Sequence, residues 1–178
     1  MEVIKVHNKT FKKSISEEDI LNRVREIALE ISKEFKYKKP LILPVLNGSF
    51  MFASDLMKEL DIDCEIQFVK VQSYTGMEST EEVKTIIGPS MTVSGRTIIV
   101  VEDIVDTGNT IVELVNQLET LNPNEVKVCS LLYKPNKYKG NVKIDYFGFE
   151  IPDDFVVGYG LDYDGLGRNL RQIYTVTE

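Results

Sequence analysis

The sequence predicts an α/β fold in which a central, mainly parallel, twisted sheet carries helices on both faces. Two observations support this prediction. Short, continuous apolar runs, which are typical of buried strands, occur at 41–46 and 97–101. After a short polar connection, each run is followed by apolar residues at helical spacing. Strands that alternate with helices in this way usually form a parallel sheet with helices packed on both of its faces.

The length and composition are those of a single globular domain. The chain has 178 residues, of which 43% are hydrophobic and 28% are charged, so it can bury a sizeable core. We find no internal repeat, low-complexity segment or linker. We therefore expect one domain over residues 1–178, with an N-terminal helix and a C-terminal appendage of strands and loops.

The N-terminal part of the chain predicts a helix and then a strand–turn–helix unit. Apolar residues at helical spacing favour a helix over about 17–35, and Ser16, three residues before Asp19, suits its N-terminal cap. The run 41–46 predicts a buried strand. A tight turn and a second helix, with apolar positions between 52 and 60, should follow it.

Further strands are expected along the rest of the chain. Alternating residues at 64–68 predict a strand with one exposed face, and the polar stretch 72–82 predicts a mobile loop. A strand near 83–88 should form a hairpin with a neighbour. The run 97–101 predicts a strand that leads through a polar loop, 102–110, into a helix. The remaining predicted strands are 126–132, 144–149, 156–160 and 173–177.

Charge and residue counts argue against several classes of function. Acidic residues outnumber basic residues by 28 to 21, which disfavours nucleic acid and anionic membranes as partners. The single histidine, His7, disfavours histidine metal clusters and Ser-His-Asp or Cys-His catalysis. Cys64 and Cys129 form no CxxC pair, so we expect reduced thiols in a cytoplasmic protein. No signal peptide or membrane-spanning run is apparent.

The polar segment 102–110 lies where open parallel sheets bind ligands, between the end of a strand and the start of a helix. Gly108 allows close approach of an anion, Thr107 and Thr110 offer hydroxyls, and the loop amides can surround a phosphate. The segment matches neither the GxxxxGK[ST] nor the GxGxxG pattern. Alternatively, it is an ordinary turn in which Thr107 or Asn109 caps the helix.

Two adjacent carboxylates, Glu102 and Asp103, directly follow the predicted strand. In such a crowded place they need a cation, hydroxyl donors or protonation. A magnesium ion would supply the cation, and sugar hydroxyls would supply the donors. The alternative is a solvated acidic loop in an acidic protein.

The segment 100–110, VVEDIVDTGNT, resembles the phosphoribosyl-diphosphate-binding signature of type I phosphoribosyltransferases. Further matches, to the members that act on hypoxanthine and guanine, are Ser73, Tyr74, Lys134, the segment 148–163 and Arg168. They occur in the family's order, which is more specific than one short pattern. The resemblance extends from about residue 40 to the C-terminus. It implies the type I phosphoribosyltransferase fold, with a small hood formed by the chain ends, and a role in purine salvage.

The resemblance implies transfer of the phosphoribosyl group from 5-phosphoribosyl 1-diphosphate to N9 of a 6-oxopurine base, with release of pyrophosphate. Asp106 would be the general base at purine N7, and a neighbouring phosphate with Glu102 and Asp103 is expected to raise its pKa. On its own, Asp106 could also be a helix cap. The residues implied for the 5-phosphate and ribose are Glu102, Asp103, Asp106, Thr107, Gly108, Asn109 and Thr110.

The implied purine-binding residues are Lys134, Phe155, Val156 and Asp162. Lys134 would donate to the oxygen at C6 and oppose adenine, because a lysine can only donate. Phe155 would stack on the base, and Val156 would present backbone groups to its edge. Magnesium would lie at Glu102 and Asp103, and Asp162 would bind a second magnesium that also holds the pyrophosphate. Without the resemblance, Lys134 would be interpreted as a solvated lysine, Phe155 and Val156 as core residues, and Asp162 as part of an acidic stretch.

The implied pyrophosphate-binding residues are Asn47, Gly48, Ser73, Tyr74 and Arg168. The first two lie in a loop where family members form a cis peptide before glycine and use its amides. Familiar members carry lysine or arginine where Asn47 stands, so one positive charge is missing here. Ser73 and Tyr74 are expected on a lid over the reacting sugar. The alternative for Ser73 and Tyr74 is an ordinary surface loop, and the alternative for Arg168 is a surface salt bridge.

Three other functions remain open at this point. The first is a type I transferase for another base, such as xanthine. The second is a regulator that reuses the fold to bind RNA, which the net charge of −7 disfavours. The third is a catalytically silent nucleotide-binding module. The resemblance also implies a homodimer or homotetramer, with no nucleic-acid or membrane partner.

Overall fold

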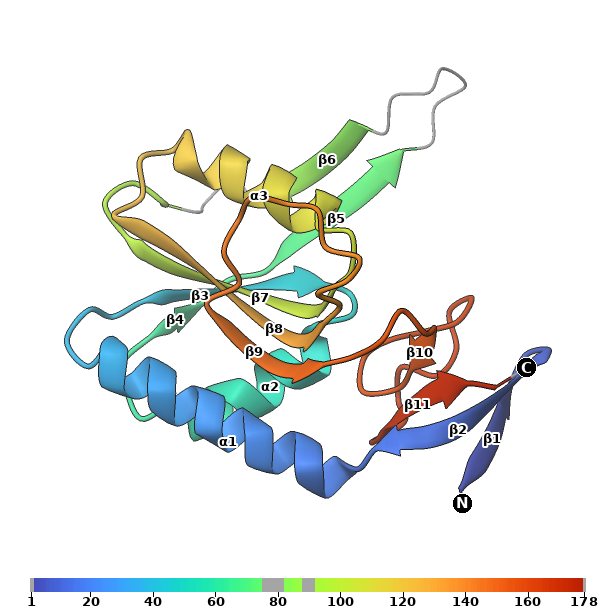
Figure 1. Cartoon of the computed structure of the whole chain (residues 1–178). Helices are drawn as coiled ribbons and strands as arrows, with labels where there is room; N and C mark the ends of the chain where they lie inside the picture. The colour runs from blue at the N-terminus through green and yellow to red at the C-terminus, as the bar shows by residue number, and fades with distance from the viewer. Residues whose placement is uncertain (1, 75–81, 88–91, 178) are drawn as a thin grey trace.

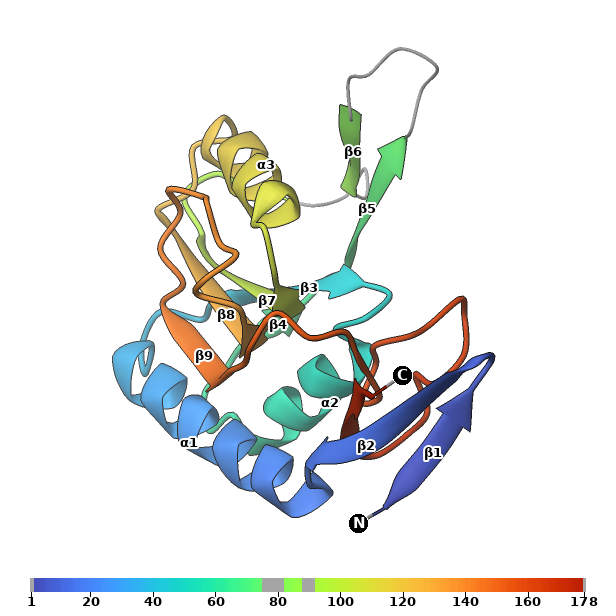
Figure 2. The same cartoon turned by 45° about the vertical axis from the view of Figure 1, so that its right-hand side comes forward.

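The computed structural model describes residues 2–74, 82–87 and 92–177, with the backbone alone for 72–74 and 82–87. Two units lie side by side: a core built on a seven-stranded sheet, and a hood built on a four-stranded sheet. Both chain ends lie in the hood (Figure 2). The carboxyl ends of the central core strands point toward the side where the hood lies (Figure 1).

The core sheet has the order β6-β5-β3-β7-β8-β9, and β4 also pairs with β3. Every pairing is parallel except the β5–β6 hairpin, which confirms both the parallel sheet and the hairpin that the sequence predicts. The apolar runs form the buried central strands β3 and β7. The strands are β3 (Leu41–Leu46), β4 (Glu65–Ile66), β5 (Val69–Tyr74), β6 (Glu82–Ile87), β7 (Thr97–Val105), β8 (Glu125–Tyr133) and β9 (Tyr146–Glu150).

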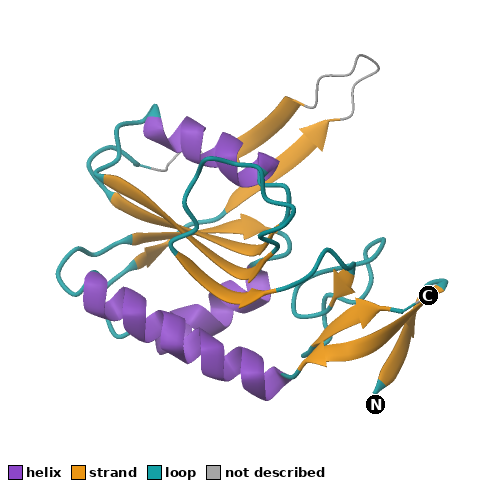
Figure 3. Ribbon diagram, viewed as in Figure 1, coloured by secondary structure: helices purple, strands orange, loops and turns teal. Residues whose placement is uncertain are grey.

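Helices cover both faces of the core sheet (Figure 3). α1 (Glu17–Glu34) and α2 (Phe50–Glu59) lie on one face and α3 (Asn109–Glu119) on the other. The cap of α1 is as predicted, since the Asp19 N–H donates to Ser16 Oγ at 3.1 Å. No helix in the described part of the chain is long and apolar enough to cross a membrane.

Two hydrophobic layers follow from the alternation of side chains along the strands. In β7, Ile99 and Val101 pack toward α1 and α2, whereas Ile98 and Val100 pack toward α3.

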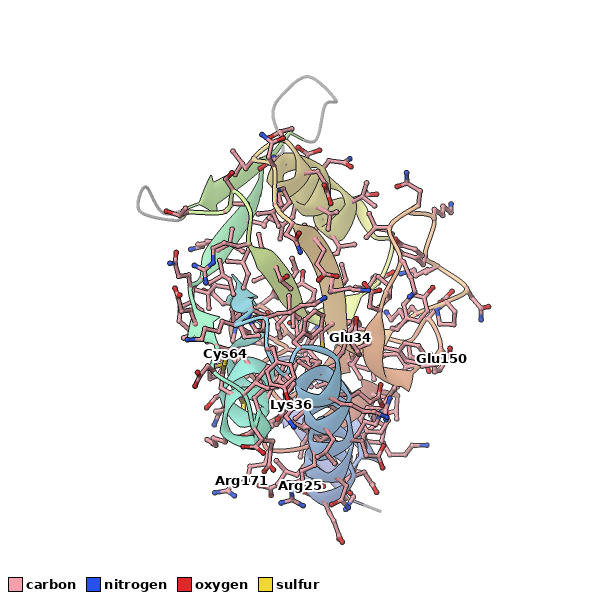
Figure 4. All side chains as sticks on the ribbon, turned by 90° about the vertical axis from the view of Figure 1, so that its left-hand side faces the viewer. Arg25, Glu34, Lys36, Cys64, Glu150 and Arg171 are labelled. Atoms are coloured by element: carbon pink, nitrogen blue, oxygen red, sulfur yellow. The ribbon has the colours of Figure 1, made fainter. Side chains whose placement is uncertain are left out.

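The outer surface is charged. Arg25 and Arg171 extend away from the protein in Figure 4.

The hood is an antiparallel sheet of order β1-β2-β11-β10. Its strands are β1 (Val3–Val6), β2 (Lys9–Ile15), β10 (Val156–Val157) and β11 (Ile173–Val176). The sequence analysis missed β1 and β2 because β1 has only four residues and β2 is mostly polar. Phe11 is their only fully buried residue. The strand expected over 156–160 is shorter, because Gly158, Tyr159 and Gly160 have positive φ angles.

Two local predictions were wrong. The segment 64–68 is not one strand with a buried face, because Ile66 and Phe68 are exposed and β4 contains only two residues. The chain pairs with the start of β3 through β4 and with its end through β5, in the same register, and residues 67 and 68 between the two belong to neither strand. In addition, β5 extends to Tyr74, so the first residues of the expected loop 72–82 are strand. Residues 75–81 lie outside the described residues.

The hood is attached to the core by a buried tyrosine. The Tyr159 hydroxyl donates to Asp55 Oδ2 of α2 at 2.6 Å, and its ring is almost fully buried. Burial, with the nearby Asp55 carboxylate, raises the pKa of Tyr159 well above its ordinary value. The hydroxyl therefore stays protonated and donates at every physiological pH.

We predict that Tyr159→Phe lowers the free energy of unfolding by roughly 1.5 kcal/mol, because a buried hydrogen bond to a carboxylate is lost. Urea denaturation followed by circular dichroism measures this. The control is Tyr163→Phe, whose hydroxyl donates to the exposed Asn8 and should matter much less. Equal losses in the two variants would contradict the anchoring role of Tyr159.

Candidate active site

The parallel register of β7 and β8 brings an acid and a lysine together. Val105 lies opposite Tyr133, so Asp106 and Lys134, the next residue on each strand, emerge side by side. The Lys134 N–H donates to the Val105 carbonyl at 3.0 Å. The Lys134 ammonium donates to Asp106 Oδ2 at 3.1 Å, and Lys137 donates to the same oxygen at 3.2 Å.

The carboxylate of Asp106 is satisfied on one side only. Lys134 is 4% exposed. Oδ1 of Asp106 is buried and has no hydrogen-bond partner among the described residues. Because buried polar atoms are nearly always hydrogen-bonded, this oxygen can accept from a water molecule or from a ligand.

The loop after Asp106 presents backbone amides. Gly108 has φ of +91° and precedes the first residue of α3, Asn109. None of the described side chains caps this helix, so the suggestion that Thr107 or Asn109 caps it is wrong. The free N–H groups and the helix dipole favour an anion here. A cavity of about 290 Å³ lies over the loop, lined by residues 102–111, which include Thr110.

Glu102 and Asp103 lie within β7 rather than in the predicted polar loop, because the strand continues to Val105. Burial, together with the neighbouring Asp103, raises the pKa of Glu102 well above its ordinary value. Burial also raises the pKa of Asp103 to about 6, although the Ile104 N–H donates to it at 2.9 Å. The two acids are therefore not a solvated surface pair.

Gly48 leaves the space that Asp103 occupies. A Cβ atom at position 48 would lie only 1.5 Å from Asp103 Oδ2. A cis peptide bond joins Leu46 to Asn47, one peptide earlier than the bond before glycine that the sequence analysis expected. Asn47 itself is exposed. Gly48, Asp103 and Thr110 share the lining of a second cavity of about 160 Å³.

A loop of the hood reaches the same place. A Cβ at Gly160 would lie 2.0 Å from the Gly48 carbonyl oxygen, so the two backbones are in direct contact. Arg168 donates to the Gly160 carbonyl at 2.7 Å and pairs with Asp162 at 2.7 Å. Arg168 and Asp162 both act on the pKa of Asp103, in opposite directions. Gly48, Asp103, Asp162 and Arg168 are therefore neighbours.

Phe155, the predicted purine-stacking residue, is partly exposed to solvent. Phe155 is 44% exposed, and its ring packs against Tyr163 and Phe11 at centroid distances of 5.6 Å and 6.3 Å. Val156 is buried in β10 opposite Thr175. The backbone of Ser73 and Tyr74 lies in β5, and their side chains lie outside the description.

The pKa of Asp106 is lowered in the ligand-free protein. Partial burial raises its pKa, but hydrogen bonds and charge from Lys134 and Lys137 outweigh burial and lower it. The sequence analysis expected a rise from a neighbouring phosphate together with Glu102 and Asp103, which stays a prediction for the phosphate-bound protein, and it overlooked Lys137. The signal that could have found Lys137 is its position three residues after Lys134, in the turn that follows β8.

The chain was compared with known proteins. Residues 13–164 match the phosphoribosyl transferase domain. The hypoxanthine-guanine phosphoribosyltransferase of Staphylococcus aureus is 38% identical over 96% of both chains, and that of Aquifex aeolicus is 37% identical over 97% of this chain and 98% of the relative. A crystal structure of the hypoxanthine-guanine phosphoribosyltransferase of Bacillus anthracis superimposes with a TM-score of 0.86, at 37% identity, over 94% of this chain and 97% of that one. The chain therefore belongs to the phosphoribosyl transferase domain family.

Proposed function

We propose that this chain is a purine-salvage enzyme that transfers the 5-phosphoribosyl group from 5-phosphoribosyl 1-diphosphate to N9 of hypoxanthine, and of guanine, giving IMP or GMP and pyrophosphate. The observation that carries the proposal is the pairing of Asp106 and Lys134 beside a loop of free helix amides. The relatives named hypoxanthine-guanine phosphoribosyltransferase support it, because they match nearly the whole chain.

The 5-phosphate binds the loop from Asp106 to Thr110. Its oxygens accept from backbone amides at the start of α3 and from the hydroxyls of Thr107 and Thr110, and Asn109 contributes to the same loop. Gly108 keeps the backbone open to the phosphate. Glu102 and Asp103 accept from the ribose hydroxyls.

Magnesium is the proposed cofactor, and the residues present suit it. Mg²⁺ prefers oxygen ligands and is usually bound by one or two carboxylates together with substrate phosphates. The described residues offer Glu102, Asp103 and Asp162, and they contain no cluster of three or more acidic, histidine or cysteine ligands. Glu102 and Asp103 would hold one Mg²⁺ together with the substrate, and Asp162 would hold a second. When bound, the ions would neutralise charge on the departing pyrophosphate.

The proton moves through Asp106. As N9 of the base attacks C1 of the ribose, the bond from C1 to the pyrophosphate oxygen breaks and its electron pair leaves with pyrophosphate. The base then gives up the proton at N7 to the carboxylate of Asp106, whose lowered pKa keeps it ionised in the ligand-free protein. Lys134 donates to the oxygen at C6, and a 6-amino group would oppose this donor.

The hood supplies the remaining contacts. Phe155 stacks on the base through its exposed face, Val156 offers backbone groups, and Asp162 lies near the base edge. Arg168 and the amides of the Asn47–Gly48 loop bind pyrophosphate, with Ser73 and Tyr74 closing over it. Because hood and core both contribute, residues 1–178 act as one domain.

Two further properties belong to the proposal. The enzyme works as a homodimer or homotetramer. The free thiols of Cys64 and Cys129 suit a reducing compartment, and we place the enzyme in the cytoplasm.

An ultraviolet assay of nucleotide formation tests the proposed function. Hypoxanthine, guanine, xanthine and adenine are offered separately with 5-phosphoribosyl 1-diphosphate and Mg²⁺. Product from hypoxanthine or guanine, and none from adenine, would support the proposal. Product from xanthine alone would change the substrate, and no product from any base would overturn the activity.

Asp106→Asn should lower kcat about 100-fold or more, because the amide cannot accept the N7 proton. Binding of 5-phosphoribosyl 1-diphosphate, measured by calorimetry, should change little. Asp63→Asn is the control, since this acid is exposed and pairs only with Lys39 among the described residues. Unchanged turnover in Asp106→Asn would remove Asp106 from the role of base.

Lys134→Ala should reduce the preference for hypoxanthine over adenine roughly 10- to 100-fold, because one charged hydrogen bond to the C6 oxygen is lost. The ratio of kcat/KM for the two bases measures this. Lys143→Ala, which removes an exposed lysine from the same connection, should keep the wild-type ratio. If selectivity survives in Lys134→Ala, another group recognises the C6 substituent.

The raised pKa of Asp103 makes the ligand-free protein sensitive to pH. An acid whose pKa is about 6 when folded and roughly 4 when unfolded binds its proton more tightly in the folded state. Its contribution to stability therefore falls as pH rises from about 4 to about 6, by roughly 1–3 kcal/mol.

Asp103→Asn should remove this loss, so that the variant unfolds at higher urea concentration than wild type at pH 7 in the absence of Mg²⁺ and substrate. The difference between the two proteins should shrink toward pH 4. Asp63→Asn should follow the wild-type pH profile. A constant difference across this pH range would show that Asp103 does not titrate there.

A further inference from the structure

We propose that Lys137 is a positioning residue for the reaction: together with Lys134 it holds Oδ2 of Asp106 and so fixes the orientation of the carboxylate that accepts the N7 proton. This inference rests on the proposed function, because it assigns a purpose to a contact of the proposed general base. Lys137 Nζ lies 3.2 Å from Asp106 Oδ2, and Lys134 Nζ lies 3.1 Å from the same oxygen. Two cations therefore hold one carboxylate oxygen, while the buried Oδ1 has no hydrogen-bond partner among the described residues.

Lys134 and Lys137 differ in their surroundings. Lys134 is almost fully buried, whereas the Lys137 side chain is about half exposed at the rim of the site. In the proposed reaction the ammonium of Lys134 donates both to Asp106 and to the purine oxygen at C6. Within the described ranges, Asp106 is the only ion-pair partner of Lys137. Lys137 is therefore the cation that remains with Asp106 throughout the reaction.

The backbone fixes the position of Lys137. The N–H groups of Lys137 and Tyr138 both donate to the Lys134 carbonyl, at 3.1 Å and 3.0 Å, which forms a tight turn. The Lys139 N–H donates to the Thr107 carbonyl at 3.2 Å. The Tyr138 ring packs on Gly108, where a Cβ would lie 2.3 Å from it. The turn and the phosphate loop are therefore held together at several points.

The arrangement has an electrostatic consequence. The charged groups that act most on Asp106 are Lys134 and Lys137, both from the connection after β8, and burial acts against them. An opposite charge at this distance favours the ionised carboxylate. Without Lys137, Asp106 would keep its proton to a higher pH. IMP synthesis needs the ionised form, whereas the reverse reaction needs the protonated form.

The kinetic experiment compares Lys137→Met, Lys137→Arg and the matched control Lys143→Met. Lys143 lies in the same connection and pairs with Asp145, also at 3.2 Å. In Lys137→Met the acidic limb of the pH profile of kcat/KM for IMP formation should move up by about one unit. Activity should therefore fall about tenfold on that limb and stay near wild type at high pH. Lys137→Arg, which keeps the charge, and Lys143→Met should retain the wild-type limb.

A measurement independent of activity accompanies the kinetics. The carboxyl carbon of Asp106, labelled with ¹³C, is titrated by NMR in ligand-free wild type and Lys137→Met, with Asp106→Asn for assignment. The proposal expects a higher pKa in Lys137→Met. An unmoved carboxyl titration, or an unmoved kinetic limb in an active enzyme, would overturn the role of Lys137 alone. A wild-type chain that forms no nucleotide from any base would overturn the proposed function and this role with it.

Discussion

The register between two parallel strands determines the chemistry of this site. Because Val105 and Tyr133 are paired at the ends of β7 and β8, Asp106 and Lys134 leave the sheet together and meet above its edge. Parallel strands also place the start of α3 directly after Asp106, so that free amides lie beside the acid. An acceptor for a proton, a donor for an oxygen and a cradle for an anion therefore arise from one pairing of strands.

The site holds its charges in two ways. At Asp106 the negative charge is compensated within the protein, by two lysines, and the acid remains ionised. At Glu102 and Asp103 burial dominates, and both acids hold their protons more tightly than in water. The first arrangement suits a group that must be ready to accept a proton. The second suits carboxylates whose negative charge is balanced only when the substrate and its metal ion bind. Without these ligands, the two buried acids lower the stability of the protein.

Much of the core could be predicted from local patterns. The runs at 41–46 and 97–101 are buried on both faces, so their apolar continuity is unmistakable, and the Ser16 cap depends on residues three positions apart. The neighbourhood of Asp106 and Lys134 follows once a parallel sheet is assumed. The contact of Gly160 with Gly48 could not be predicted, because it joins backbones 112 residues apart through the absence of side chains. The strands β1 and β2 were missed because they depend on pairing, of β1 with β2 and of β2 with β11, and the second pairing joins residues from opposite ends of the described chain.

The sheet of the hood joins the two ends of the described chain, since Ile15 of β2 is paired with Ile173 of β11. Contacts between residues so far apart in sequence form late, because a long loop must close first. The pairs of the core sheet are closer in sequence, so that sheet closes shorter loops than the pairing of β2 with β11 does. The ring of Phe155 and the guanidinium of Arg168 reach their positions only with the hood. A refolding chain would thus acquire its anion-binding loop before it could enclose a base.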